Sequence, residues 1–479
     1  MIHEKQWKNA ALFLIQASII IVNTILFAFV WYEYYRGKMW GSTFHRRGDY
    51  VLVFLYFCLY AVMSKIYGGV QLKTSRISEL IYSQIVAAFI TNILMYFVIL
   101  LLTRRPKSIL PLLMVLLIEV IISSIWSYWA NKLTNKIFKP AKVLLVYDNS
   151  EAYRNGKDIL NRLPWRFSPL GEMKISIDND MNDITDKMKK TGADSLMLCG
   201  LSSSQRNNVI KYCVEHDIKA FVRPNIGDFI IGNSQVIQMA NLPVMICERA
   251  TPSVLYTLVK RAMDIVISLI GLVLSSPFLI ITSILIKAYD HGPVFYKQVR
   301  LTKDAREFEI LKFRSMKVDA EKDGVARLSS ENDDRITPVG KVIRACRIDE
   351  LPQLINILKG DLSVVGPRPE RPEIAAQYVE EMPEFSLRLQ VKAGLTGYAQ
   401  VYGKYNTEPY DKLQMDLMYI NKMSFVSDIK IIFATIKILF MPESTEGIAE
   451  GATTAISGSD KENNVETRNI YYEKSSNSN

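Results

Sequence analysis

Two adjacent carboxylates, Asp349 and Glu350, stand in the basic, motif-rich part of the chain that covers residues 287–442. Leucine and isoleucine recur behind them at i, i+3, i+4 and i+7, which predicts an amphipathic helix with both acids in its first turn. The helix dipole favours negative charge there, so an ordinary stabilising role is the simpler interpretation. The nearby Arg344 and Arg347 indicate more, because they could neutralise a phosphate that an anionic carboxylate must approach.

Arg368 stands between Pro367 and Pro369 in the sequence GDLSVVGPRPE. Prolines stiffen a loop, and a guanidinium held in place loses little entropy when it binds a phosphate through two hydrogen bonds. A rigid surface turn would explain the same residues. Upstream, the alternation over residues 308–316 predicts a strand that places Lys312 on the face opposite its apolar side chains.

Taken in order, the motifs of residues 261–403 resemble the catalytic domain of the bacterial sugar transferases, the polyprenyl-phosphate hexose-1-phosphate transferases. The matching motifs are PVFYKQVR (293–300), KFRSM (312–316), DDRITPVG (333–340), RIDELPQLINILKGDLSVVGPRPE (347–370) and GLTGYAQVYG (394–403). Residues 394–400 read as a glycine-rich turn. One departure is Ala393, where the family usually has proline before the glycine; it lies away from the acidic pair and leaves the activity in no doubt.

The resemblance implies transfer of hexose-1-phosphate from UDP-glucose or UDP-galactose to undecaprenyl phosphate, with release of UMP, in capsule or exopolysaccharide synthesis. It implies that Asp349 is a nucleophile forming an aspartyl-phosphate-sugar intermediate, and that Glu350 binds Mg²⁺ beside the diphosphate. The residues implied to hold the phosphates and nucleotide are Lys312, Arg344, Pro367, Arg368 and Pro369. The rival mechanism is direct attack within a ternary complex, with Asp349 binding only metal.

The elements that must position these residues begin with membrane segments. Hydrophobic residues make up 49% of the 479 and cluster before residue 140. Four apolar stretches each approach the roughly 20 residues that a helix needs to cross a bilayer: residues 10–31, 50–67, 81–102 and 109–130. The net charge of +10 suits phosphate-rich partners, and the membrane segments favour lipid and nucleotide over nucleic acid.

The membrane topology follows from lysines after the fourth stretch, Lys132, Lys136, Lys139 and Lys142. They favour a cytoplasmic exit and therefore a cytoplasmic N-terminus. We expect a multi-pass protein of the bacterial plasma membrane with a cytoplasmic catalytic domain. A fifth apolar run, residues 263–286, contains Pro277, which predicts a kink. Composition leaves open a kinked span or a helix that turns back, and the resemblance implies a re-entrant helix over residues 262–287.

A small α/β domain lies between the fourth apolar stretch and the fifth apolar run. Residues 142–147, 195–199 and 219–223 predict buried parallel strands, and residues 204–215 predict a helix. No glycine follows the first strand until Gly156, so a degenerate structural or regulatory module is favoured over a dinucleotide site.

The predicted architecture is an integral membrane α-helical bundle (1–140), a Rossmann-like α/β domain (141–250), and an α+β membrane-associated catalytic domain (251–445), followed by a disordered polar tail (446–479). Residues 425–441 are expected to lie on the membrane surface. A non-catalytic scaffold of a polysaccharide assembly complex is the main alternative. A processive glycosyltransferase would need a DxD-type motif, of which residues 178–180 and 333–334 are weak versions. A homodimer is compatible with this architecture, and the sugar and final polymer stay open.

Overall fold

The computed structural model describes residues 2–36, 46–175, 181–239, 241–318, 335–403 and 408–439. The chain divides into two compact units, Met1–Asn225 and Ile226–Asn479. The predicted disordered tail and both weak DxD-type motifs, at 178–180 and 333–334, lie outside the described residues.

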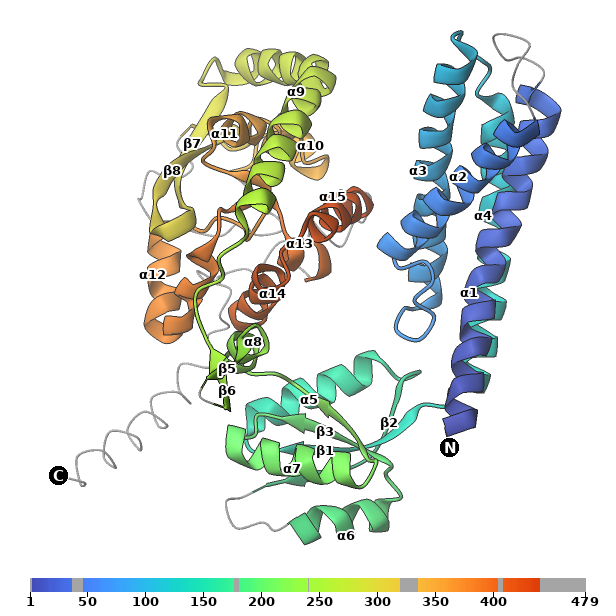
Figure 1. Cartoon of the computed structure of the whole chain (residues 1–479). Helices are drawn as coiled ribbons and strands as arrows, with labels where there is room; N and C mark the ends of the chain where they lie inside the picture. The colour runs from blue at the N-terminus through green and yellow to red at the C-terminus, as the bar shows by residue number, and fades with distance from the viewer. Residues whose placement is uncertain are drawn as a thin grey trace. The chain divides into compact units, whose positions relative to one another are not determined.

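The first unit begins with long apolar helices that lie side by side (Figure 1). Their bounds are α1 (Ile2–Val30), continued by the π-helical turn η1 (Trp31–Tyr35), α2 (Arg46–Ile66), α3 (Ile77–Thr103) and α4 (Leu110–Ile137). Each is long and apolar enough to cross a membrane, which confirms the predicted stretches. The chain is therefore a membrane protein.

A buried polar network joins the helices of this bundle. Glu119 on α4 is fully buried and accepts hydrogen bonds from Tyr56 Oη on α2 and Asn92 Nδ2 on α3, each at 2.6 Å. On a neighbouring level, Asn23 on α1 donates to Tyr60 Oη at 2.6 Å. Polar groups without partners are costly in hydrocarbon, so the network favours one packing of the helices.

We predict that Glu119→Leu lowers the free energy of unfolding by about 1–2 kcal/mol, because Tyr56 and Asn92 lose their common acceptor. Glu119→Gln retains an acceptor and should cost less. Thermal unfolding of the detergent-solubilised protein measures both, with Ile118→Val on the exposed side of α4 as the control. Equal stability of the leucine variant and the native protein would contradict a stabilising network.

The rest of the first unit is an α/β domain with a four-stranded parallel sheet in the order β2-β1-β3-β4. The strands are β1 (Ala141–Tyr147), β2 (Phe167–Lys174), β3 (Ser195–Cys199) and β4 (Lys219–Val222). Helix α5 (Ser150–Arg162) covers one face, and α6 (Met181–Thr191) and α7 (Ser203–Glu215) cover the other. The three predicted parallel strands and the predicted helix are confirmed, although β4 is partly exposed and not buried as expected. Strand β2 was missed because its sequence, FSPLGEMK, has neither an apolar run nor regular alternation.

The second unit begins with α8 (Ile226–Gly232) and an antiparallel hairpin of β5 (Gln235–Met239) and β6 (Leu242–Ile246), which the sequence did not reveal. Helix α9 (Val254–Asp290) follows and contains Pro277. Figure 1 shows α9 changing direction along its length, as the proline predicted.

A compact α+β body follows α9. An antiparallel pair, β7 (Phe295–Leu301) and β8 (Glu307–Phe313), flanks a parallel pair, β9 (Ser363–Val365) and β10 (Gly394–Thr396). Its helical elements are η3 (Lys303–Ala305), α10 (Pro338–Ala345), η4 (Ile348–Glu350), α11 (Gln353–Lys359), α12 (Pro372–Glu381), η5 (Pro383–Gln390), α13 (Tyr398–Tyr402), α14 (Pro409–Asn421) and α15 (Phe425–Leu439). One apolar core joins α11, β9, α12, α14 and α15.

Two local predictions are wrong. The acids are not in the first turn of a helix, because Asp349 and Glu350 form the separate 3-10 turn η4, and α11 starts only after Pro352. Proline lacks an amide, so residue 352 cannot donate the backbone hydrogen bond that would join η4 to α11. Leu351 nevertheless keeps helical backbone, and the apolar spacing continues across the break. The predicted glycine-rich turn begins instead with the strand β10, which pairs with β9.

Both ends of α9 contact this body. Near its start, Arg261 donates to the carbonyl oxygens of Ile357 and Leu358 at 2.6 and 2.8 Å, which satisfies the last turn of α11. Asp264 accepts from the Val364 amide at 2.9 Å. At the other end, Asp290 pairs with the buried Arg314, next to β8.

Candidate active site

Glu350 lies at the centre of three cations from different segments. Its Oε1 is 3.1 Å from Lys312 Nζ on β8 and 3.0 Å from Arg368 Nη2 in the loop after β9. Its Oε2 is 3.8 Å from Arg347 Nη1, which comes just before η4. The Glu350 side chain is only 14% exposed, so the carboxylate is withdrawn from solvent and depends on these cations.

Asn356 explains how η4 meets Lys312. This buried side chain on α11 accepts from the Leu311 amide at 2.9 Å and donates to the Glu309 carbonyl at 2.8 Å. The two bonds fasten α11 along β8 on either side of Ile310, two positions before Lys312. Phe313 on the same strand is buried and stacks on Phe295, which fixes the direction of the lysine side chain.

The electrostatics separate the two carboxyl groups. Burial opposes ionisation, but Lys312, Arg368 and Arg347 together hold the pKa of Glu350 well below its usual range. Burial and the neighbouring Glu350 charge raise the pKa of Asp349. Burial lowers the pKa of Lys312, although Glu350 opposes that shift. The surroundings therefore favour the ionised form of Glu350 and disfavour the ionised form of Asp349.

Asp349 makes no hydrogen bond or ion pair with any residue that the structure describes. Lys312, Arg344 and Arg347 act on it through longer-range attraction. Arg347 has a φ of 56°, which is a strained conformation for a residue with a Cβ atom. The turn thus presents the Asp349 carboxylate with several cations nearby, but with no ion pair to any of those that the structure describes.

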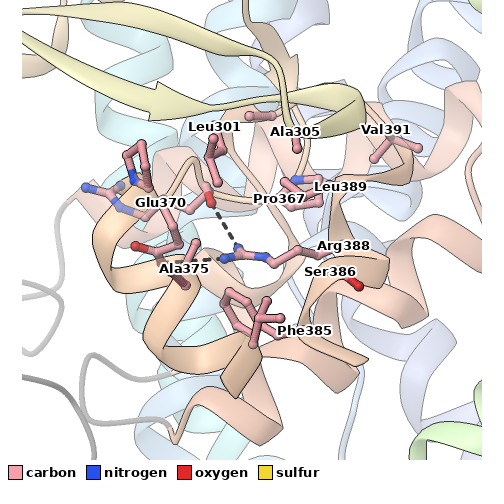
Figure 2. A pocket seen from close by; sticks show the side chains of 15 residues that line it. Leu301, Ala305, Pro367, Glu370, Ala375, Phe385, Ser386, Arg388, Leu389 and Val391 are labelled. Carbon is pink, nitrogen blue, oxygen red and sulfur yellow. Dashed lines mark hydrogen bonds and ion pairs between the residues drawn. The ribbon is translucent and has the colours of Figure 1, made fainter. Parts of the chain in front are cut away.

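Arg368 is exposed, whereas the flanking Pro367 and Pro369 are buried. A mainly apolar cavity of about 290 Å³ lies beside this loop, lined by residues of α12 and η5 (Figure 2). Its polar lining includes Glu370 and Arg388. The predicted residues therefore come together as one site: Asp349, Glu350, Lys312 and Arg368 around the acidic turn, Arg344 within electrostatic reach, and the two prolines behind Arg368.

The donor set suits Mg²⁺ completed by a substrate. Among the described residues, no three His, Cys, Asp or Glu side chains are grouped to hold a metal ion. Mg²⁺, however, commonly takes one or two carboxylates together with water and substrate phosphates. Asp349 and Glu350 can supply those carboxylates.

Residues 255–442 match the family model of the bacterial sugar transferases. The matched region holds every residue of the site. It is also 40% identical, over 188 residues, to the exopolysaccharide production protein PSS of Rhizobium leguminosarum bv. phaseoli; the match covers 37% of this chain and 92% of that protein. This chain belongs to the bacterial sugar transferase family.

Longer relatives match only in part. The chain is 43% identical to a UDP-N-acetylgalactosamine-undecaprenyl-phosphate N-acetylgalactosaminephosphotransferase of Aeromonas hydrophila, over 39% of this chain and 44% of that protein. It is 38% identical to a UDP-glucose:undecaprenyl-phosphate glucose-1-phosphate transferase of Escherichia coli, over 44% and 47%. The chain thus spans about half the length of these curated relatives.

Two arginines near the site, the half-buried Arg300 and the buried Arg388, were not predicted to have a role. Arg300 belongs to the PVFYKQVR motif, but the motif gave no reason to single it out. Arg388 pairs with Asp416 at 2.7 Å across 28 residues of sequence, a contact that no local pattern encodes.

We predict that Glu350→Gln lowers the free energy of unfolding at pH 7 by roughly 3 kcal/mol, since three cations lose their counter-charge. A carboxyl whose pKa is depressed by folding stabilises above its unfolded pKa, about 4.3 for Glu, and loses that effect as the pH falls. The difference in the free energy of unfolding between the native protein and the Glu350→Gln variant should therefore become smaller below about pH 4.3. Thermal melts between pH 7 and 3 measure it. Glu309→Gln, whose exposed partner is Lys297, is the control, and a gap that does not change with pH would contradict the assignment.

Proposed function

We propose that this chain transfers hexose-1-phosphate from a UDP-sugar to undecaprenyl phosphate, releasing UMP, as the first membrane step of capsular or exopolysaccharide synthesis. The observation that carries the proposal is an unengaged carboxylate, Asp349, beside a carboxylate that three cations hold. The names of the Aeromonas and Escherichia relatives give the same reaction class with different sugars. UDP-glucose or UDP-galactose is the donor we expect.

In the first step, a diphosphate binds where Lys312, Arg347 and Arg368 converge, so its charge is neutralised before an anion approaches. An oxygen of Asp349 bonds to the phosphorus that carries the sugar. The bond from that phosphorus to the bridging oxygen breaks, and UMP leaves with the electron pair. Glu350 would hold Mg²⁺ together with phosphate oxygens, and a bound Mg²⁺ would supply further charge neutralisation.

In the second step, a phosphate oxygen of the polyprenyl phosphate attacks the same phosphorus. The carboxylate of Asp349 leaves, and the product is polyprenyl-diphosphate-sugar. Asp349 is regenerated without a net proton change in the protein. Direct attack by the lipid phosphate in a ternary complex gives the same products without the covalent enzyme.

The reaction class is tested by product release from the purified, solubilised chain. We expect UMP release that requires both undecaprenyl phosphate and Mg²⁺, with either UDP-glucose or UDP-galactose as donor. Release of UDP would identify a glycosyltransferase instead. No release with any nucleotide-sugar, including the N-acetylated ones, would favour the scaffold alternative.

The covalent step predicts isotope exchange. With the lipid acceptor omitted, labelled UMP should enter the UDP-sugar pool, because the first step is reversible on its own. Asp349→Asn should abolish both exchange and turnover, while the exposed Asp304→Asn serves as an unaffected control. Turnover without exchange would support direct attack, and full activity of Asp349→Asn would eliminate Asp349 as the nucleophile.

We also propose the predicted topology, with a cytoplasmic N-terminus, a cytoplasmic catalytic domain over residues 251–445, and α9 as a re-entrant helix. The contacts of Arg261 and Asp290 support it, since both ends of α9 touch one body and a bilayer core is about 30 Å thick. On this topology α15 lies at the membrane surface. A Rossmann-like module without a cofactor (141–250) and a homodimer are further proposals.

A further inference from the structure

The loop of residues 367–370 is held through its backbone carbonyls. The Gly394 amide donates to the Pro367 oxygen at 2.9 Å, and the Leu301 amide donates to the Glu370 oxygen at 3.0 Å. The two carbonyls between them accept from side chains: Arg388 Nη2 to Arg368 at 2.9 Å, and Arg300 Nη1 to Pro369 at 3.1 Å. Four successive carbonyls are therefore bonded to four different positions of the body.

The arginine clamp consists of Arg300, whose side chain is 17% exposed, and the buried Arg388, and the two share a counter-ion. Glu370 lies 3.8 Å from Arg300 Nη1 and 3.5 Å from Arg388 Nη1. Arg388 also pairs with Asp416, which is 1% exposed, at 2.7 Å. Figure 2 shows the Arg388 side chain reaching across the cavity towards Glu370. Two guanidinium groups and two carboxylates thus form a cluster of ion pairs behind the loop.

Removing these charged groups from water costs desolvation free energy, and a protein with apolar side chains of similar size in their place would often be at least as stable. The cost is visible at Arg300, whose Nε is buried without a hydrogen-bond partner among the described residues. Burial lowers the pKa of Arg300 to about 10; nearby Glu370 opposes this shift, while Arg368 and Arg371 add to it. Because apolar side chains would often be at least as stable, stability does not explain the two arginines, and the loop that they bind indicates another role. That loop directs the Arg368 side chain to Glu350.

We propose that Arg300 and Arg388 are positioning residues that act through the backbone of Arg368. By fixing the carbonyls of Arg368 and Pro369, they hold the Arg368 guanidinium towards the acidic turn before a diphosphate arrives. The entropy of ordering this side chain is then lost during folding and not during binding. This inference rests on the proposed function for its ligand, a nucleoside diphosphate, but not for the geometry of the loop.

The affinity for UDP, measured by calorimetry, tests whether Arg300 and Arg388 act by positioning the Arg368 side chain. Arg300→Gln and Arg388→Lys should each weaken UDP binding about tenfold, the effect of losing one charge-assisted hydrogen bond. Arg300→Gln should cost nothing further in an Arg368→Ala background, because no guanidinium remains to be positioned. An equal loss in both backgrounds would overturn the proposal. Arg306→Gln, an exposed arginine paired with Asp361, is the matched control.

Hydrogen exchange separates this inference from the proposed function. The amides of Leu301 and Gly394 report on the loop, since they donate to its outer carbonyls. In Arg300→Gln their exchange should accelerate about tenfold relative to the native chain, while Arg306→Gln leaves it unchanged. Unchanged exchange in Arg300→Gln would refute the clamp. Faster exchange in a chain that binds no UDP would instead retain the clamp and reject the nucleotide ligand. If Arg388→Lys does not fold, Arg300→Gln alone decides both measurements.

Discussion

A carboxylate that leaves water must be compensated, and Glu350 shows how much of the structure follows from that requirement. Its partners, Lys312, Arg347 and Arg368, come from a strand, from the residue before a 3-10 turn, and from a loop. Each of these segments supplies one cation. The body brings the three together, and the same convergence that satisfies Glu350 produces a surplus of positive charge. That surplus surrounds Asp349 and makes the turn a place where a phosphate can bind.

The meeting of these three cations at Glu350 depends on packing contacts between residues that take no part in the proposed reaction. Asn356 joins α11 to β8, and close backbone approach joins β9 to β10. A methyl group at Gly366 would meet the Lys392 carbonyl and the Gly394 amide, so this approach requires glycine. The glycine-rich motif after residue 393 thus has a packing role: it lets the loop of Arg368 sit against β10. The departure at Ala393 is consistent with this, because Ala393 is buried there and keeps its amide, which donates to Thr302 Oγ1 at 3.2 Å.

Elements with a long and regular hydrophobic pattern could be predicted from the sequence, whereas contacts between residues far apart in the sequence could not. The apolar stretches, the strands β1 and β3, and the kink at Pro277 follow from composition and local sterics. The amphipathic helix was expected to hold Asp349 and Glu350 in its first turn, but α11 begins only at Gln353, because Pro352 cannot donate a backbone hydrogen bond while the apolar spacing continues through it. Lys312, Glu350 and Arg368 were expected at one site from a resemblance in motif order. Arg388 and Asp416 were not, because their pairing is set by tertiary packing alone.

The ties between α9 and the body connect the membrane to the chemistry. Arg261 caps the end of α11, and Asp264 holds Val364 in β9, the strand that leads to Arg368. A shift of α9 would therefore act both on the helix that follows the acidic turn and on the strand that leads to Arg368. On α15, the buried Asp428 pairs with Lys260 of α9 at 2.9 Å. Charged groups on apolar helices are costly unless they are paired, so these pairings fix the two helices to the body that holds the site. On the proposed function and topology, these helices would lie at the membrane face, and the pairings would hold Asp349 at a fixed depth relative to the phosphate of a lipid acceptor.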